Sequence, residues 1–181
     1  MNIRPATPAD APAIAAIYAD ACLNGFGTFE EVPPSADEIV TRMANVQSRG
    51  LPYLVAEENG EILGYAYAGP FRLRAAYRYT VEDSVYVSPR AKGRGVGGAV
   101  LTAVLDACAA MGLRQVMAVI GDTGNEGSIG LHKALGFAPV GTFKDVGYKK
   151  ERWLDIVLMQ KSLNGGAQTP PDAPGLSLSG F

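Results

Sequence analysis

The chain has 181 residues, 48% of them hydrophobic, which is enough for one well-cored globular domain. Its 16 basic and 18 acidic residues leave a net charge of −2, so no nucleic-acid partner is indicated. No apolar run approaches the length of a membrane span, the first residues lack the apolar segment of a signal peptide, and two cysteines cannot build a disulfide framework; we therefore expect a cytoplasmic protein with no membrane partner.

Hydrophobic periodicity predicts an α/β (α+β) fold. Two capping boxes, at residues 7–10 and 35–38, precede the first two predicted helices. A glycine-rich turn before Val96 and a capping Asn125 start the other two. Strands are expected at residues 2–4, 53–57, 62–68, 77–87, 115–120, 138–144 and 152–161. The order is β-α-α-β-β-β-α-β-α-β-β, in a mixed and mostly antiparallel sheet with helices on both faces.

Three further expectations concern burial and domain limits. The strand at 152–161 carries apolar residues at both parities, which predicts burial on both faces. Cys22 and Cys108 fall in helical patterns and are expected in the core. Residues 1–163 form the expected single domain, whereas residues 164–181 form a tail rich in Gly, Pro and Ser, ordered only if it docks on something.

Residues 80–98 have the pattern of a strand, a glycine turn and a helix start. Gly93, Gly95 and Gly98 match the G-x-G-x-x-G motif of dinucleotide folds, but residues 88–92 separate the first glycine from its strand and no second βαβ half follows. The alternative is an acyl-coenzyme A site. Free N–H groups at a helix start suit a pyrophosphate, and the pantetheine arm can hydrogen-bond a strand edge. We favour this second interpretation.

Residues 85–97 resemble the acetyl-CoA signature of the GCN5-related N-acetyltransferase (GNAT) family, and residues 125–137 resemble the helix that follows it. The resemblance implies the GNAT fold over about residues 1–162, with acetyl-CoA as co-substrate and no metal. The implied cofactor contacts are Val85, Tyr86, Val87, Lys92, Gly93, Arg94, Gly95, Val96, Gly97, Gly98, Asn125 and Ser128. The family usually has Gln or Arg at the position of Lys92, and Arg90 also fits the spacing to the glycines.

Three pieces outside the cofactor loop, residues 66–77, 80–87 and 141–155, look like those of the phosphinothricin and methionine sulfoximine acetyltransferases of this family. The resemblance implies acetylation of the α-amino group of a small glutamate-like amino acid, and usually a homodimer. We expect direct transfer without an acetyl-enzyme, because neither cysteine looks like an activated nucleophile.

Glu82 and His132 are the catalytic candidates. A carboxylate within a strand of Thr, Val, Tyr and Ser is rarely a core residue, and it could instead be solvated or pair with Arg78. An amine nucleophile must lose a proton, and the resemblance assigns Glu82 as the general base that takes it. His132 is the only histidine, and the resemblance places it where many members carry a Tyr that protonates the departing thiolate. Its alternative role is simple packing.

The predicted substrate contacts are Arg72, Leu73, Arg74 and Phe29. The two arginines lie in a loop just before the Glu82 strand, where their guanidinium groups could bind a carboxylate or phosphinate, or could simply be solvated. Phe29, together with Phe26, could line the same pocket or close the core.

Two other functions fit the sequence. One is a GNAT enzyme that acetylates another small amine or a protein N-terminus. The other is a non-catalytic acyl-CoA-binding regulator, against which the presence of Glu82 with a second proton-transfer candidate argues.

Overall fold

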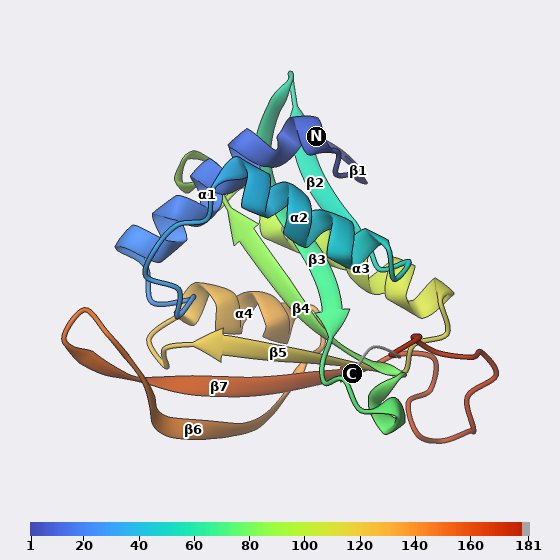
Figure 1. Cartoon of the computed structure of the whole chain (residues 1–181). Helices are drawn as coiled ribbons and strands as arrows, with labels where there is room; N and C mark the ends of the chain where they lie inside the picture. The colour runs from blue at the N-terminus through green and yellow to red at the C-terminus, as the bar shows by residue number, and fades with distance from the viewer. Residues whose placement is uncertain (179–181) are drawn as a thin grey trace.

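The computed structural model describes residues 1–178 and shows a seven-stranded sheet within them (Figure 1). The strands are β1 (Asn2–Pro5), β2 (Tyr53–Glu58), β3 (Glu61–Pro70), β4 (Thr80–Val87), β5 (Gln115–Gly121), β6 (Ala138–Lys149) and β7 (Arg152–Ser162). The α-helices are α1 (Ala11–Asn24), α2 (Ala36–Gln47), α3 (Val96–Ala110) and α4 (Glu126–Ala134), and short 3-10 helices are η1 (Pro8–Asp10), η2 (Ala75–Tyr77) and η3 (Pro89–Ala91). The predicted element order is confirmed.

The sheet opens between its two parallel strands. Its order is β1-β2-β3-β4-β5-β7-β6, and only β4 and β5 are parallel neighbours. They pair from Thr80 opposite Gln115 to Asp83 opposite Ala118. Beyond this point β4 follows β3 and β5 follows β7, so the two strands diverge (Figure 1). The opening lies at the carboxyl ends of both strands, where open α/β sheets commonly bind ligands.

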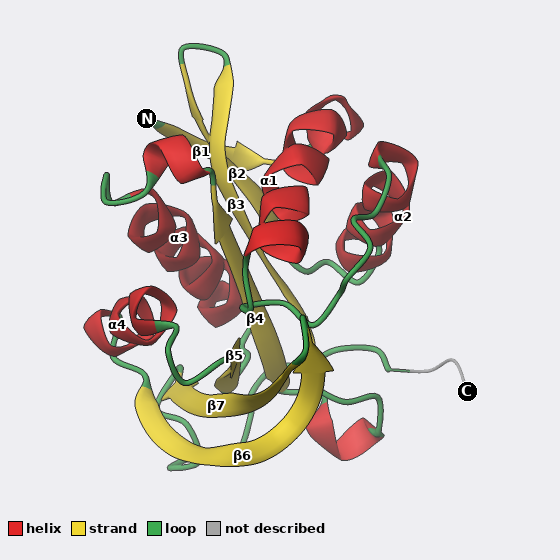
Figure 2. Ribbon diagram, turned by 90° about the vertical axis from the view of Figure 1, so that its left-hand side faces the viewer, coloured by secondary structure: helices red, strands yellow, loops and turns green. Residues whose placement is uncertain are grey.

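Helices cover the two faces of the sheet separately. Figure 2 shows α1 and α2 on one face and α3 and α4 on the other. Buried side chains form one cluster on each face: Ile14, Tyr18, Ile39 and Met43 belong to the first, and Val100, Leu101, Val104 and Leu105 to the second. Cys22 lies in the first cluster and Cys108 in the second, so both are core residues as predicted.

The helix caps and the hairpin turn expected from the sequence are present in the structure. The capping box of Thr7 and Asp10 is formed, and Ser35 Oγ accepts a hydrogen bond from the Glu38 N–H at 3.2 Å. Asn59 and Gly60 both have positive φ, +53° and +82°, as a type I′ hairpin turn requires. These short-range interactions set the starts of the helical elements and the β2–β3 register.

Three expectations were wrong in detail. The strand expected from residue 77 begins only at Thr80, because residues 75–77 form η2. The strand expected to end at residue 144 continues to Lys149, with an irregular register between Phe143 and Gly147. The last strand is not buried on both faces: Trp153 is 60% exposed although Leu154 is buried. Within the described residues, the β6–β7 hairpin curls beyond the helices, which leaves its outer face open (Figure 2).

The residues after β7 dock on the sheet end through Arg114, which is itself buried. Its guanidinium donates to the carbonyl oxygens of Asn164 at 2.6 Å and Pro170 at 3.0 Å. The Tyr79 hydroxyl donates to the Ala173 carbonyl oxygen at 2.8 Å. Leu176 is buried in the same cluster as α3. Residues 164–178 therefore pack on the domain, and the rest of the expected tail lies outside the described residues.

Candidate active site

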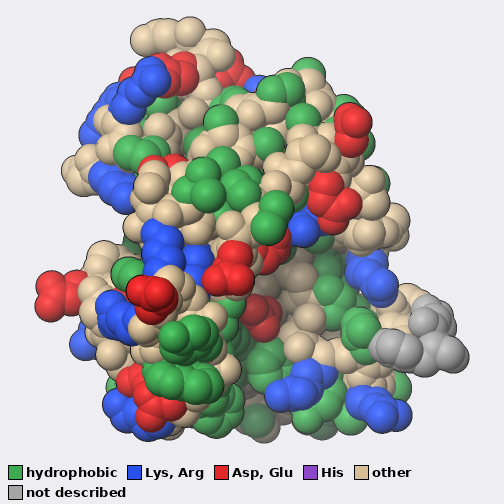
Figure 3. Space-filling view, turned by 60° about the vertical axis from the view of Figure 1, so that its left-hand side comes forward, with side chains coloured by type: hydrophobic (Ala, Val, Ile, Leu, Met, Phe, Trp, Pro, Cys, Tyr) green, Lys and Arg blue, Asp and Glu red, His purple; other side chains and the backbone are tan. Residues whose placement is uncertain are grey.

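A large cavity fills the opening between β4 and β5. Its volume is about 1110 Å³, and its walls come from β4, the turn before α3, the end of β5, α4 and the loop between α1 and α2. The space-filling view shows the molecule hollowed on one face, with acidic and basic side chains bordering the hollow (Figure 3). Most predicted site residues line this cavity: Phe29, Glu82, Val85, Tyr86, Val87, Lys92, Gly93, Gly95, Val96, Gly97, Gly98, Asn125, Ser128 and His132.

The turn before α3 forms an anion cradle from backbone groups. Gly93 and Gly95 have φ of +77° and +78°, a conformation that favours glycine, and a Cβ added at either would meet no protein atom within 4 Å. The helix's first N–H groups, from Val96 onward, have no partner within the helix, because the Ala99 N–H makes the first bond, to the Gly95 carbonyl oxygen. Open space above free N–H groups at a helix start suits a pyrophosphate.

The neighbouring edge of β4 supplies an extended surface. Val85, Tyr86 and Val87 line the cavity beyond the last β4–β5 pair, at Asp83. Their backbone faces β3 on one side, whereas the β5 side is left open by the divergence. An extended, amide-rich arm can therefore add to this edge as a strand would.

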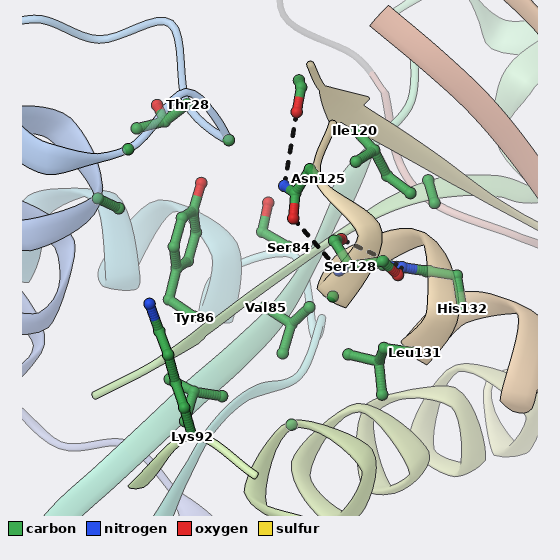
Figure 4. Close-up of a pocket in the computed structure, with 18 of the residues that line it drawn as sticks. Thr28, Ser84, Val85, Tyr86, Lys92, Ile120, Asn125, Ser128, Leu131 and His132 are labelled. Carbon is green, nitrogen blue, oxygen red and sulfur yellow. Dashed lines mark hydrogen bonds between the residues drawn. The ribbon is translucent and has the colours of Figure 1, made fainter. Parts of the chain in front are cut away.

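The start of α4 forms the facing wall (Figure 4). Asn125 Oδ1 accepts the Ser128 N–H at 3.2 Å, which confirms the predicted helix cap. Asn125 and Ser128 lie across the cavity from Tyr86 and Lys92 in this view. The cofactor candidates of the helix and of the strand thus border one space.

Glu82 is half-buried in the cavity wall. Burial, and then the charge of Asp83, raise the pKa of Glu82 to about 7, while the charge of Arg72 opposes this shift. A carboxyl group with a pKa near neutrality can accept and release a proton at working pH. Glu82 therefore has the environment of a general base.

His132 is buried, with both ring nitrogens in hydrogen-bond contact. Nε2 lies 2.9 Å from Asp83 Oδ2, and Nδ1 lies 2.7 Å from the Ser128 carbonyl oxygen. Burial lowers the pKa of His132, but the hydrogen bond and charge of Asp83 and the Ser128 carbonyl more than offset this, so the net shift is upward. The sequence did not indicate Asp83, since no local pattern tells which carboxylate of a strand a helix histidine will meet.

The loop between α1 and α2 closes one side of the cavity. Buried Lys149 donates from Nζ to the Thr28 carbonyl oxygen at 2.8 Å, and the Thr28 hydroxyl lies 2.8 Å from that of Tyr18. The ring of Phe29 rests against Gly147, where an added Cβ would lie 2.2 Å from it. Phe29 thus reaches from the loop to β6 while lining the cavity.

Four of the predicted residues lie outside the cavity wall. Arg72, Leu73 and Arg74 are exposed, and the guanidinium of Arg72 stands 5.3 Å from the centre of the Phe71 ring. Only Arg72 acts on the site electrostatically, through Glu82. Arg94, in the glycine turn, pairs with Glu58 instead of facing the cavity.

Comparison with known proteins identifies the family and the fold. Residues 3–158 match the family described as Acetyltransferase (GNAT) domain. The chain belongs to this family, so the GNAT resemblance is confirmed and the protein is an N-acetyltransferase. Among residues 1–178, no group of three His, Cys, Asp or Glu is placed to hold a metal ion, and no helix is long and apolar enough to cross a membrane.

Three known proteins are similar to this chain over most of its length. The chain is 52% identical to the phosphinothricin N-acetyltransferase of Alcaligenes faecalis, over 90% of this chain and 83% of that one. It is 41% identical to the L-methionine sulfoximine/L-methionine sulfone acetyltransferase of Pseudomonas paraeruginosa, over 93% and 98%. A phosphinothricin acetyltransferase structure from Sinorhizobium meliloti, in complex with acetyl-CoA, superposes with a TM-score of 0.90 at 46% identity, covering 94% of this chain and 92% of that one.

Proposed function

We propose that the protein transfers the acetyl group of acetyl-CoA directly to the α-amino group of a small glutamate-like amino acid. Phosphinothricin, methionine sulfoximine and methionine sulfone are the proposed substrates, in agreement with the names of its relatives. The observation that carries this proposal is the half-buried Glu82, with a pKa of about 7, in the cavity where β4 and β5 diverge.

The cofactor side uses backbone groups of the turn and of β4. The N–H groups of residues 93–98 would hold the pyrophosphate, and the open edge at Val85, Tyr86 and Val87 would hold the pantetheine arm. Asn125 and Ser128 stand on the far wall, close enough to the cavity to contact that arm. Bound in this way, acetyl-CoA supplies an activated thioester carbonyl.

The catalytic side uses two proton-transfer groups. Glu82 takes a proton from the substrate ammonium or amine, directly or through water, and so frees the nitrogen lone pair for attack. His132 is the proposed source of the proton for the departing thiolate. Holding amine and thioester together in one cavity makes the reaction effectively intramolecular.

The state of the thiols supports the proposed direct transfer. Burial raises the pKa of both Cys22 and Cys108, the latter to about 12, so neither is a thiolate near neutral pH. We expect the mass of the intact protein to be unchanged after incubation with acetyl-CoA alone. An added acetyl mass on the protein that a later addition of amine removes would contradict direct transfer.

Substrate recognition is proposed for Arg72, Leu73, Arg74 and Phe29. The arginine loop begins directly after β3 and leads into the Glu82 strand, and the charge of Arg72 reaches Glu82. An exposed pair of guanidinium groups can bind a carboxylate and a tetrahedral oxygen-rich end with charge-assisted hydrogen bonds. Phe29 would bound the same space from the opposite loop.

The test is release of free CoA thiol from acetyl-CoA in the presence of an amino-acid panel and a peptide panel. We expect turnover with phosphinothricin, methionine sulfoximine and methionine sulfone, and little with peptides or with amines that lack a carboxylate. Preferential turnover of peptides would favour a protein N-terminus as substrate. Acetyl-CoA binding without turnover of any amine would favour the regulator.

A homodimer is proposed through the β6–β7 hairpin. The support is the number of exposed apolar side chains on these strands: Val140, Phe143, Val146, Tyr148 and Trp153. A two-fold dimer would pair this surface with itself. We expect light scattering to give twice the chain mass and Phe143→Glu to give the monomer mass; a monomeric parent would contradict the assignment. The cytoplasmic location stays a prediction.

A further inference from the structure

The pair formed by Asp83 and His132 joins β4 to α4 at the base of the cavity. The side chain of Asp83 is 1% exposed and that of His132 is 3% exposed, and their Oδ2 and Nε2 atoms are 2.9 Å apart. Asp83 is also the last residue of β4 that pairs with β5. The pair therefore sits where the two strands part, among residues that line the cavity.

Hydrogen-bond geometry limits the protonation of this pair. The Ser128 carbonyl oxygen can only accept, so the close contact at 2.7 Å places a proton on Nδ1. A second proton must lie between Nε2 and the Asp83 carboxylate. Two protons and one carboxylate make the pair electrically neutral, which is the arrangement that burial allows.

A hydroxyl group connects the ring to the cavity. Ser128 Oγ lies 3.4 Å from His132 Nδ1, so the proton on Nδ1 faces both the carbonyl and the hydroxyl oxygen of one residue. Figure 4 shows Ser128 between His132 and the open space that Tyr86 and Lys92 border. A small rotation of the imidazole would turn the N–H from one oxygen to the other.

We propose that Asp83 is a positioning residue that holds His132 in its protonated form, and that Ser128 Oγ passes the proton of His132 to the CoA thiolate. This inference rests on the proposed acetyl transfer, because it supplies the proton that the thiolate needs.

Each proton that moves in the proposed step has a named donor and acceptor. As the C–S bond breaks, its electron pair stays on sulfur, and the sulfur takes the proton of the Ser128 hydroxyl. Ser128 Oγ takes the Nδ1 proton of His132, and the ring is left neutral with its Nε2–H donated to the Asp83 carboxylate. Solvent returns the proton to His132 between turnovers. The amine proton leaves separately, on Glu82.

The groups around the pair do not compete for this proton. On α3, burial and the charge of Asp83 raise the pKa of the Cys108 thiol to about 12, so it stays neutral. The Phe137 ring, just after α4, packs edge-on against the imidazole with centroids 4.9 Å apart and carries no charge. Glu82, next to Asp83 on β4, is the remaining titratable neighbour, and its own pKa is raised in part by Asp83.

The first experiment measures the protonation state of the His132 imidazole directly. Because His132 is the only histidine, ¹⁵N NMR of the imidazole in the untagged protein needs no assignment. We expect both ring nitrogens to be protonated at pH 7, and Asp83→Asn to lower the titration midpoint by about one unit or more. Asp106→Asn, an exposed change on α3, is the matched control and should leave the midpoint unchanged. A neutral ring at pH 7, or the same midpoint in Asp83→Asn as in the parent, would overturn the positioning role.

The second experiment uses turnover and so separates this inference from the proposed function. Ser128→Ala should lower kcat by about 10²-fold, the lower range for general acid catalysis, a much larger effect than the loss of acetyl-CoA affinity expected from removing one contact to the arm. Ser128→Thr keeps the hydroxyl and should retain most of the parent's kcat. Equal kcat in Ser128→Ala and parent would overturn the relay. If the parent acetylates no amino acid, the proposed function fails, while the NMR titration still decides whether Asp83 holds His132 protonated.

Discussion

The glycine turn of residues 93–98 and the arginine loop of residues 71–79 adjoin opposite ends of β4, yet they offer different chemical groups. The turn offers backbone N–H groups fixed at the start of α3, with open space above Gly93 and Gly95. The loop offers exposed side chains, and neither Arg72 nor Arg74 lies in the cavity wall. One region is preorganised, whereas the other would have to order its exposed side chains to bind a ligand.

With the glycine turn as the proposed cofactor site and the arginine loop as the proposed substrate site, this difference would let one scaffold keep its cofactor and change its substrate. Backbone groups tolerate most side-chain changes nearby but not a Cβ in the ligand's space, because the N–H positions come from the helix itself. Guanidinium groups on a loop can be replaced one at a time without disturbing the sheet.

Gly95→Val should abolish acetyl-CoA binding. A β-branched residue is strained at φ +78°, and its side chain would occupy the space proposed for phosphate. Calorimetric titration with acetyl-CoA measures the loss. Gly60→Val is the matched control, since Gly60 has a similar φ of +82° in the β2–β3 hairpin and does not line the cavity. If Gly95→Val binds acetyl-CoA as the parent does, the cradle is misassigned.

Glu82→Gln should lower kcat by about 10²–10⁴-fold while acetyl-CoA affinity stays near that of the parent. In the parent, the pKa of about 7 means that Glu82 is protonated, and unable to accept a proton, at lower pH. Activity should therefore rise with pH through about 7, and this limb should be absent from the residual activity of Glu82→Gln. Glu61→Gln, an exposed change on β3, is the control. A pH limb that survives in Glu82→Gln belongs to another group.

Arg74→Lys should raise KM for the amino-acid substrate by about tenfold, because Lys keeps the charge but loses the bidentate fork. The KM for acetyl-CoA should hardly change, since the glycine turn is untouched. The measurement is steady-state kinetics with each substrate varied in turn. Parent-like kinetics after replacement of both Arg72 and Arg74 by Ala would remove the loop from substrate recognition.

Lys92→Ala should weaken acetyl-CoA binding by less than about fivefold, as expected for an exposed charge worth at most about 1 kcal/mol. This small effect beside that of Gly95→Val would sharpen the contrast between side chain and backbone. The same calorimetric titration applies. A loss of binding as large as that in Gly95→Val would mean that the side chain, not the cradle, holds the phosphate.

The sequence allowed the cofactor side to be predicted in more detail than the catalytic side. Glycine spacing, strand composition and helix caps are local signals, so the turn, the end of β4 and the Asn125 cap could be predicted, although β4 begins at Thr80 and not at residue 77. The contact of Asp83 with His132 joins residues 49 positions apart and depends on how α4 lies against β4. The exposure of Trp153 was also beyond prediction, because an apolar strand pattern does not tell whether a helix will cover it.

The docking of residues 164–178 has a consequence for synthesis of the protein. Leu176 completes a core whose other buried members come from β2, β3, β4, β5, β7, α3 and their connecting segments, and the carbonyl groups that receive Arg114 come after residue 163. During translation, the chain must therefore leave the ribosome as far as Leu176 before this core can close completely. Until then, the nascent domain exposes the apolar surface on which Leu176 packs, and Arg114 lacks its carbonyl acceptors. Exposed apolar surface of this kind is what chaperones bind.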